Sequence, residues 1–188
     1  GAHIDTSGGT LQLASGLSFN SASPPPEGAL ITGSVDLGTN PHTFAVNNST
    51  GAALDLTIDG PITGTAGAAI SKTGTGTFRM TGAGNTYPGL TSITAGALEL
   101  GKSSGDAITA GGLSAENVNV SLLATTQIAD TAPVTLIGAN DTVLDLNGFT
   151  ETIGAVSLTQ TDSFDYTAIR TGAAGTLVLN GGMVLNNN

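Results

Sequence analysis

The chain has 188 residues, of which 28 are glycine, 4 are Lys or Arg and 14 are Asp or Glu, so its net charge is -10 at neutral pH. This charge would repel a phosphate backbone, which argues against a nucleic-acid partner. Cysteine is absent, 10% of the residues are charged and 39% are hydrophobic, which excludes a disulfide framework, a disordered chain and a helical membrane protein.

The first residues, Gly1-Ala2-His3, show no signal-peptide pattern and resemble the remnant of a protease cleavage site, a cloning scar. We therefore expect residues 1–188 to form a single domain that is a fragment of a larger protein. The glycine-rich composition favours strands and turns over helices throughout this domain.

A short triplet, apolar then mostly polar then apolar, returns along the whole chain. Up to Leu146 its copies follow one another at steps of about 19 to 26 residues, a loose period near 22 that is typical of solenoids. Residues two apart share one face of a strand, so each triplet directs two side chains inward and one outward. The copies are Leu11-Gln12-Leu13, Val35-Asp36-Leu37, Leu54-Asp55-Leu56, Phe78-Arg79-Met80, Leu98-Glu99-Leu100, Val118-Asn119-Val120, Leu144-Asp145-Leu146, Val156-Ser157-Leu158 and Leu177-Val178-Leu179.

This pattern predicts an all-β fold, a parallel β-helix of about eight rungs. Phe44-Ala45-Val46, Val134-Thr135-Leu136 and the neighbourhood of Val184 are expected to form a second inward face, to which Val156-Ser157-Leu158 also belongs. An antiparallel β-sandwich remains the alternative, because Asp59-Gly60 and Asn147-Gly148 are hairpin signals. The inward side chains expected to stack as aliphatic ladders are Leu13, Leu37, Leu56, Phe78, Leu98, Val120 and Leu146.

The segment from Ile70 to Gly101 resembles a known sequence repeat. It reads Ile70-Ser71-Lys72-Thr73-Gly74-Thr75-Gly76-Thr77-Phe78-Arg79-Met80-Thr81-Gly82, then Asn85-Thr86-Tyr87-Pro88-Gly89, then Ile93-Thr94-Ala95-Gly96-Ala97-Leu98-Glu99-Leu100-Gly101. In this form it is similar to the autotransporter-associated β-strand repeat, with Phe78 and Met80 in place of the usual leucines and Pro88 at the usual tyrosine-threonine-glycine corner. Residues 144–154 also look like the downstream part of such passengers, and residues 1–60 resemble them only in style.

The resemblance implies a right-handed β-helix on the cell surface of a Gram-negative bacterium, or secreted from it, as a passenger whose parent protein has an outer-membrane translocator domain. It implies a non-catalytic stalk or adhesion surface, an adhesin whose partner is a host-cell or matrix surface component, and the motif has no catalytic residues. The alternatives are a carbohydrate-binding or polysaccharide-degrading β-helix module, and a toxic passenger with the same repeat in its stalk.

The polar middle residues of the triplets predict an outward column along one face. Its members are Gln12, Asp36, Asp55, Arg79, Glu99, Asn119 and Asp145, with about 4.8 Å between neighbours. We expect mainly a solvated face with weak ion pairs, in which Arg79 lies between two acids. A cation strip near Asp36 and Asp55 is the functional alternative, although the calcium-binding nonapeptide of some solenoids is absent, so no metal site is predicted.

One further segment combines acids, aromatic residues and a base. Asp162, Asp165 and Tyr166, close to Arg170, suit either the binding of a glycan or a surface loop. No histidine pair, serine elbow or phosphate loop is present, so we predict neither catalytic residues nor a cofactor. Exposed strand edges at the ends of such a coil would favour end-to-end self-association.

Overall fold

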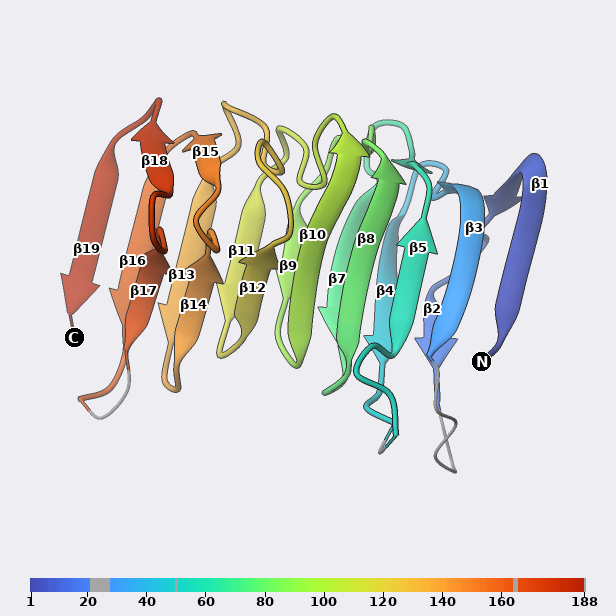
Figure 1. Ribbon diagram of the computed structural model, residues 1–188, viewed down its shortest axis with the longest axis horizontal. Coiled ribbons are helices and arrows are strands. Elements are labelled where there is room, and N and C mark those ends of the chain that lie inside the picture. The colour runs from blue at the N-terminus through green and yellow to red at the C-terminus, as the bar shows by residue number, and fades with distance from the viewer. Residues whose placement is uncertain (21–27, 50, 164–165, 188) are drawn as a thin grey trace.

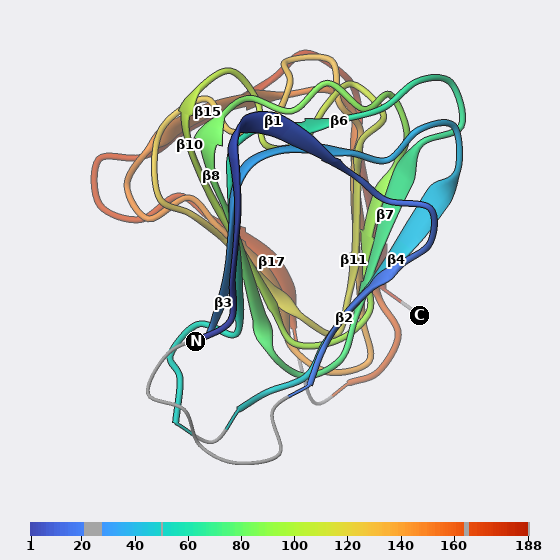
Figure 2. The ribbon, with the colours of Figure 1, turned by 90° about the vertical axis from the view of Figure 1, so that its right-hand side faces the viewer.

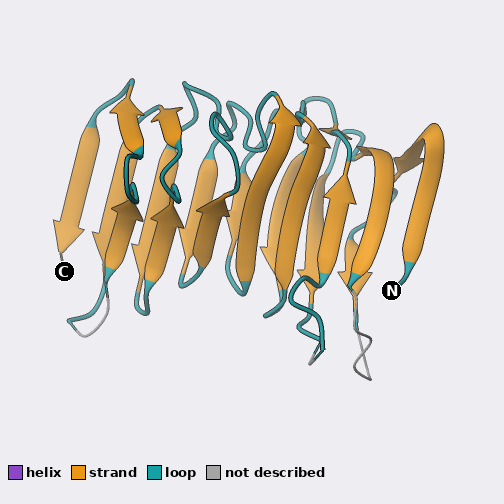
Figure 3. Ribbon diagram, viewed as in Figure 1, coloured by secondary structure: helices purple, strands orange, loops and turns teal. Residues whose placement is uncertain are grey.

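The computed structural model describes residues 1–20, 28–49, 51–163 and 166–187, and in these ranges it contains strands and turns but no helix (Figure 3). Every strand pairing among these residues is parallel. The chain coils through about seven turns as a right-handed β-solenoid, which confirms the predicted class and shows that the antiparallel sandwich is wrong. Successive turns lie side by side along the long axis, with the two termini at opposite ends (Figure 1).

Two long sheets form opposite sides of the coil (Figure 2). Sheet 1 contains, in spatial order, β1 (His3–Gln12), β3 (Ala29–Asp36), β5 (Leu56–Asp59), β8 (Thr77–Ala83), β10 (Ala97–Ser104), β12 (Asn119–Leu122), β14 (Thr142–Asp145) and β17 (Thr167–Arg170), and the short β6 (Ile62–Thr63) also pairs with β3. Sheet 2 contains β2 (Leu17–Phe19), β4 (Pro41–Val46), β7 (Ala69–Thr73), β9 (Thr91–Ile93), β11 (Leu113–Glu116), β13 (Val134–Gly138), β16 (Val156–Gln160) and β19 (Met183–Asn187).

A third, two-stranded sheet pairs β15 (Thr150–Ile153) with β18 (Thr176–Leu179) at the corner between the long sheets. The triplet Leu177-Val178-Leu179 therefore belongs to this corner and does not continue sheet 1. Residues 1–60 resembled the repeat only in style, yet their described part forms β1 to β5 of the same coil, so the solenoid extends well beyond the recognisable motif.

The core is a stack of side chains that the period-two pattern directs inward. Leu37, Leu56, Phe78, Leu98, Val120 and Leu146 are buried as predicted, and Leu13 is partly buried and packs against the same cluster. Across the coil, the ring of Phe44 in sheet 2 meets the ring of Phe78 in sheet 1 edge to face, with 5.7 Å between the centroids. The two sheets thus share one apolar interior, which stabilises each turn against its neighbours.

Candidate functional site

Sheet 1 presents one outward column that runs from turn to turn. Its register places Thr57, Arg79, Glu99, Ser121, Asp145 and Arg170 opposite one another in successive strands. Of the predicted column, Arg79, Glu99 and Asp145 are therefore correctly placed, and Gln12 and Asp36 are paired with each other further along the sheet.

Two further members of the predicted column, Asn119 and Asp55, also lie outside it. Asn119 pairs with Ala97, two residues away from the position opposite Glu99, which Ser121 occupies. Asp55 precedes β5 and is buried, and the register places Thr57, not Asp55, opposite Arg79. The placement of both residues in the outward column was wrong because the turns differ in length, which shifts the strand register by two residues.

Asp36 and Asp55 act on the backbone. Asp36 Oδ1 accepts a hydrogen bond of 2.9 Å from the backbone N–H of Gly38, as in a turn. The two carboxylate oxygens of Asp55 accept from the backbone N–H groups of Ser49, at 2.7 Å, and Thr77, at 2.8 Å. Asp55 therefore anchors a loop to the next turn and cannot contribute to a surface strip.

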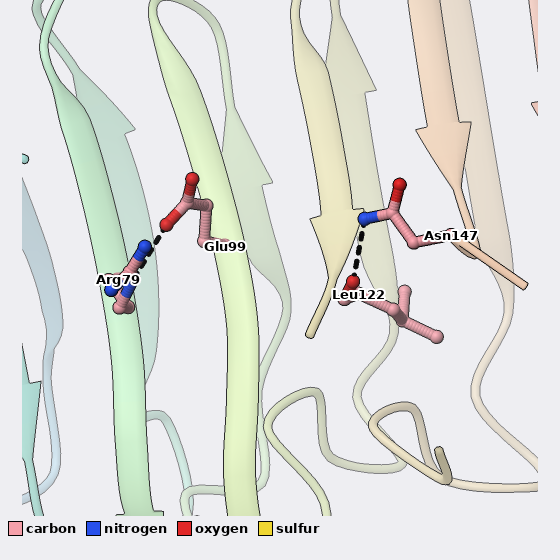
Figure 4. A network of polar contacts seen from close by, with 4 residues as sticks. All are labelled: Arg79, Glu99, Leu122 and Asn147. Atoms are coloured by element: carbon pink, nitrogen blue, oxygen red, sulfur yellow. Dashed lines mark hydrogen bonds and ion pairs between the residues drawn. The ribbon is translucent and has the colours of Figure 1, made fainter. Parts of the chain in front are cut away.

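Arg79 and Glu99 form an ion pair between adjacent strands (Figure 4). Arg79 Nε lies 2.6 Å from Glu99 Oε2, and the two side chains are 31% and 24% exposed. On its other side Arg79 faces Thr57, so the expectation that it lies between two acids was wrong. A partly exposed pair of this kind contributes about 0 to 1 kcal/mol, and we assign it no ligand.

The acidic and aromatic segment near the C-terminus lies beside this column. Gln160 Nε2 donates to Asp162 Oδ1 at 3.2 Å, so Asp162 interacts with the end of β16. The backbone N–H of Tyr166 donates to Asp141 Oδ1 at 3.1 Å, and the guanidinium of Arg170 donates to the Tyr166 hydroxyl. Asp165 lies outside the described residues.

Tyr166 and Arg170 border a polar groove of about 310 Å³ on the outer face of sheet 1. The groove crosses β12, β14 and β17, so that three turns of the coil contribute to it. Its lining consists of Asn119, Ser121, Asp141, Val143, Asp145, Tyr166 and Arg170. The sequence indicated that Tyr166 and Arg170 lie close together. It did not indicate that Asp141 and Asp145 line the same groove, because that depends on the register between turns.

The interior contains charged groups that sequence reasoning did not single out. Lys72 Nζ donates to the backbone oxygens of Gly74 and Ala95, at 2.9 and 2.8 Å. Burial lowers the pKa of Lys72 to about 8, against the opposing attraction of Asp55. The alternation of Ile70 and Lys72 on one strand face is the signal that predicts an inward lysine.

A second buried lysine begins a polar chain across several turns. Lys102 Nζ donates to the oxygens of Gly60, at 2.6 Å, and Thr81, at 2.8 Å. Burial lowers its pKa to about 8, partly offset by Asp59. The backbone N–H of Lys102 donates to Gln127 Oε1 at 2.6 Å, and Gln127 Nε2 donates to the backbone oxygen of Lys102 at 3.1 Å.

Glu151 continues this chain in the following turn. Its Oε2 accepts from the Gln127 backbone N–H at 2.6 Å. Burial raises the pKa of Glu151 to about 7, despite backbone N–H donors from Gln127, Ile128 and Thr152. These groups all lie inside the coil and satisfy its corner backbone, so we assign them a structural role.

Within the described ranges, no group of three or more His, Cys, Asp or Glu side chains is placed to hold a metal ion. Among the same residues, no helix has the length and hydropathy needed to span a membrane.

Residues 70–100 match the family model of the passenger-associated-transport-repeat. No curated protein and no solved structure gives a significant match to the chain. The matched segment begins in β7 and ends in β10, at the centre of the solenoid, and it is the segment on which the sequence resemblance was based. The sequence of residues 70–100 is therefore similar to a passenger repeat, which supports the resemblance to autotransporter passengers, and the β-solenoid around it fits such a passenger domain.

Proposed function

We propose that the chain is a non-catalytic segment of the passenger of a Gram-negative surface protein, where it acts as a rigid stalk or adhesive surface at the cell surface or after secretion. The observation that carries the proposal is the coincidence of the passenger repeat at residues 70–100 with β7 to β10 of a continuous solenoid. In such a stack each turn contacts mainly the turns next to it, so that length and display surface grow together.

The contacts inside the repeat support a mechanical role. Lys72 joins the corner after β7 to the corner after β9 through Gly74 and Ala95. Asn85 Oδ1 accepts from the Ile62 N–H at 2.8 Å and its Nδ2 donates to the Ala107 oxygen at 2.7 Å, which joins three successive turns. Bonds of this kind hold the turns in fixed register at corners where the regular sheet ladder is interrupted.

Small-angle scattering combined with multi-angle light scattering, at two concentrations, tests the stalk. We expect an elongated particle, and a compact globule would contradict the proposal. Self-association is a separate expectation, for which β19 offers exposed apolar side chains at Met183, Val184 and Leu185. A mass that rises with concentration would support that expectation.

The adhesive role is tested by the binding of the purified chain to immobilised host-cell and matrix components, compared with a heat-unfolded sample. The polysaccharide-degrading alternative predicts a different result. Incubation with neutral and anionic polysaccharides would then release reducing ends or unsaturated products, whereas the non-catalytic function predicts that neither forms.

A further inference from the structure

The groove between β12, β14 and β17 combines polar groups around a small apolar floor. Val143 faces outward from sheet 1, opposite Asn119 in the neighbouring strand, yet is only 5% exposed. Tyr166 is 42% exposed, and the Arg170 guanidinium lies 5.0 Å from the centroid of its ring. A volume of about 310 Å³ is at the lower end of the range for small-ligand clefts, about 300 to 1,000 Å³.

Some polar groups of the groove are held in place by hydrogen bonds within the chain, and the groove retains donors and acceptors for a ligand. Asp145 Oδ1 accepts from the backbone N–H of Asn147 at 2.8 Å, and the Asn147 side chain in turn donates to the Leu122 oxygen at 2.8 Å (Figure 4). Within the part of the chain that the structure describes, no hydrogen bond engages the side chain of Asn119 or Ser121. The groove thus offers fixed carboxylate acceptors together with an amide and a hydroxyl that are open to a ligand.

The charge of the groove restricts what it can bind. Asp141 and Asp145 are acidic and Arg170 is basic, on a chain with a net charge of -10. A polyanion such as a uronate or sulfated glycan would be repelled. A neutral sugar ring presents hydroxyl donors and acceptors around its rim and an apolar C–H face, which matches carboxylates, an amide and a guanidinium beside an exposed tyrosine.

We propose that this groove binds a neutral saccharide. Vicinal hydroxyls donate to the free oxygens of Asp141 and Asp145, Arg170 donates to a ring or hydroxyl oxygen, and the apolar face of the sugar packs on Tyr166. The proposal rests on the passenger function above, because it names what the displayed surface would hold. No bond in the sugar is broken, and the two acids act as hydrogen-bond acceptors only.

Nuclear magnetic resonance tests the groove on the purified chain, with methyl glucoside, galactose and N-acetylglucosamine as neutral probes and oligogalacturonate as the anionic probe. At least one neutral probe should receive saturation transfer and shift backbone amides in residues 119–121, 141–145 and 166–170. Oligogalacturonate should shift none of them. The absence of a shift with all neutral probes, or a preference for oligogalacturonate, would overturn the proposal.

Two variants localise the binding. Asp145→Asn keeps an oxygen for the Asn147 N–H but loses the charge, and it should weaken binding about tenfold, as expected for one charge-assisted hydrogen bond. Tyr166→Ala should have an effect of similar size. The matched control is Glu99→Gln, in the same column but outside the groove, which should bind like the parent. Unchanged binding in both groove variants would show that the sugar binds elsewhere.

The two proposals fail in different ways. Rod-shaped scattering without sugar binding would overturn the groove and leave the stalk intact, whereas a compact particle would overturn the stalk itself. Amide spectra of each variant, compared with the parent, establish that the fold is retained before any binding is measured.

Discussion

Truncation of Leu98 measures how strongly the turns of the solenoid are coupled. Leu98 is fully buried and lies in register between Phe78 and Val120 of the neighbouring strands. Leu98→Ala removes about three methylene-sized groups, which corresponds to about 2.4 kcal/mol of transfer free energy at about 0.8 kcal/mol each. Parallel ladders on both sides limit collapse into the cavity, so we expect a total loss of about 3 to 4 kcal/mol in the free energy of unfolding.

Urea unfolding followed by far-ultraviolet circular dichroism provides the assay. With a slope of about 2 kcal/mol per molar urea, the midpoint should fall by about 1.5 to 2 M. The matched control is Leu123→Ala, because Leu123 is 39% exposed and its truncation should lower the free energy of unfolding by less than about 1 kcal/mol. Equal midpoints for Leu98→Ala and the parent would refute the stacked core as the source of stability.

A stacked repeat can also unfold in parts. If the turns are only loosely coupled, Leu98→Ala should split the transition or lower its slope, because the turns on either side of the cavity then unfold separately. A single transition with an unchanged slope would instead show that the buried contacts make the solenoid one cooperative unit.

Three further predictions concern the corners, the interior and the surface. Gly74→Ala should lower the free energy of unfolding by about 1 to 3 kcal/mol, since Gly74 has a φ of 77° and an added Cβ would meet the preceding turn, while Gly182→Ala, with open space around it, should be nearly neutral in the same urea assay. The folded-state pKa of Glu151 is raised to about 7 from an ordinary 4.5, so its contribution to stability should be present below about pH 4.5 and be lost as the pH rises through about 7. Glu151→Gln should therefore flatten this part of the plot of unfolding free energy against pH, and a slope identical to that of the parent would contradict the assignment. A double-mutant cycle on Arg79 and Glu99 should give a coupling below about 1 kcal/mol that declines with added salt, and a larger coupling that is insensitive to salt would show that the pair acts as a buried one.

The inward positions could be predicted from the sequence because strand alternation is a local rule. Phe78, Leu98 and Val120 were placed in the core from their triplets alone, and each is fully buried. Parallel stacking followed from the period near 22 residues, which is too long for hairpins and suits a coil of several strands.

The relative register of the turns could not be predicted, because it depends on how long each corner is. Asp55 shows this most clearly. Its triplet suggests an outward residue, but the loop before β5 shifts the strand register by two residues. The Asp55 carboxylate instead accepts hydrogen bonds from the backbone N–H groups of Ser49, in that loop, and Thr77, in the next turn. The groove was missed for the same reason, since Asp141 and Asp145 reach Tyr166 only through the pairing of β14 with β17.

The buried lysines show why a chain with so few basic residues places two of them inside. Gly60 follows β5, where the chain leaves the sheet ladder, and its oxygen accepts from Lys102 Nζ. The Thr81 oxygen accepts both from the Gly60 backbone N–H, at 3.1 Å, and from Lys102 Nζ. An aliphatic side chain in place of Lys102 would fill that space but would remove the bond to the Gly60 oxygen, and a buried acceptor left without a partner costs about 1 to 3 kcal/mol. Lys102 continues the inward alternation of Leu98 and Leu100, and its ammonium group bonds to both oxygens. Its desolvation, visible in the lowered pKa, is thus offset by bonds that tie its turn to the two before it. Lys72 makes the same kind of contact within the passenger repeat, through the oxygens of Gly74 and Ala95, so the geometry of a solenoid corner explains the lysine of that repeat.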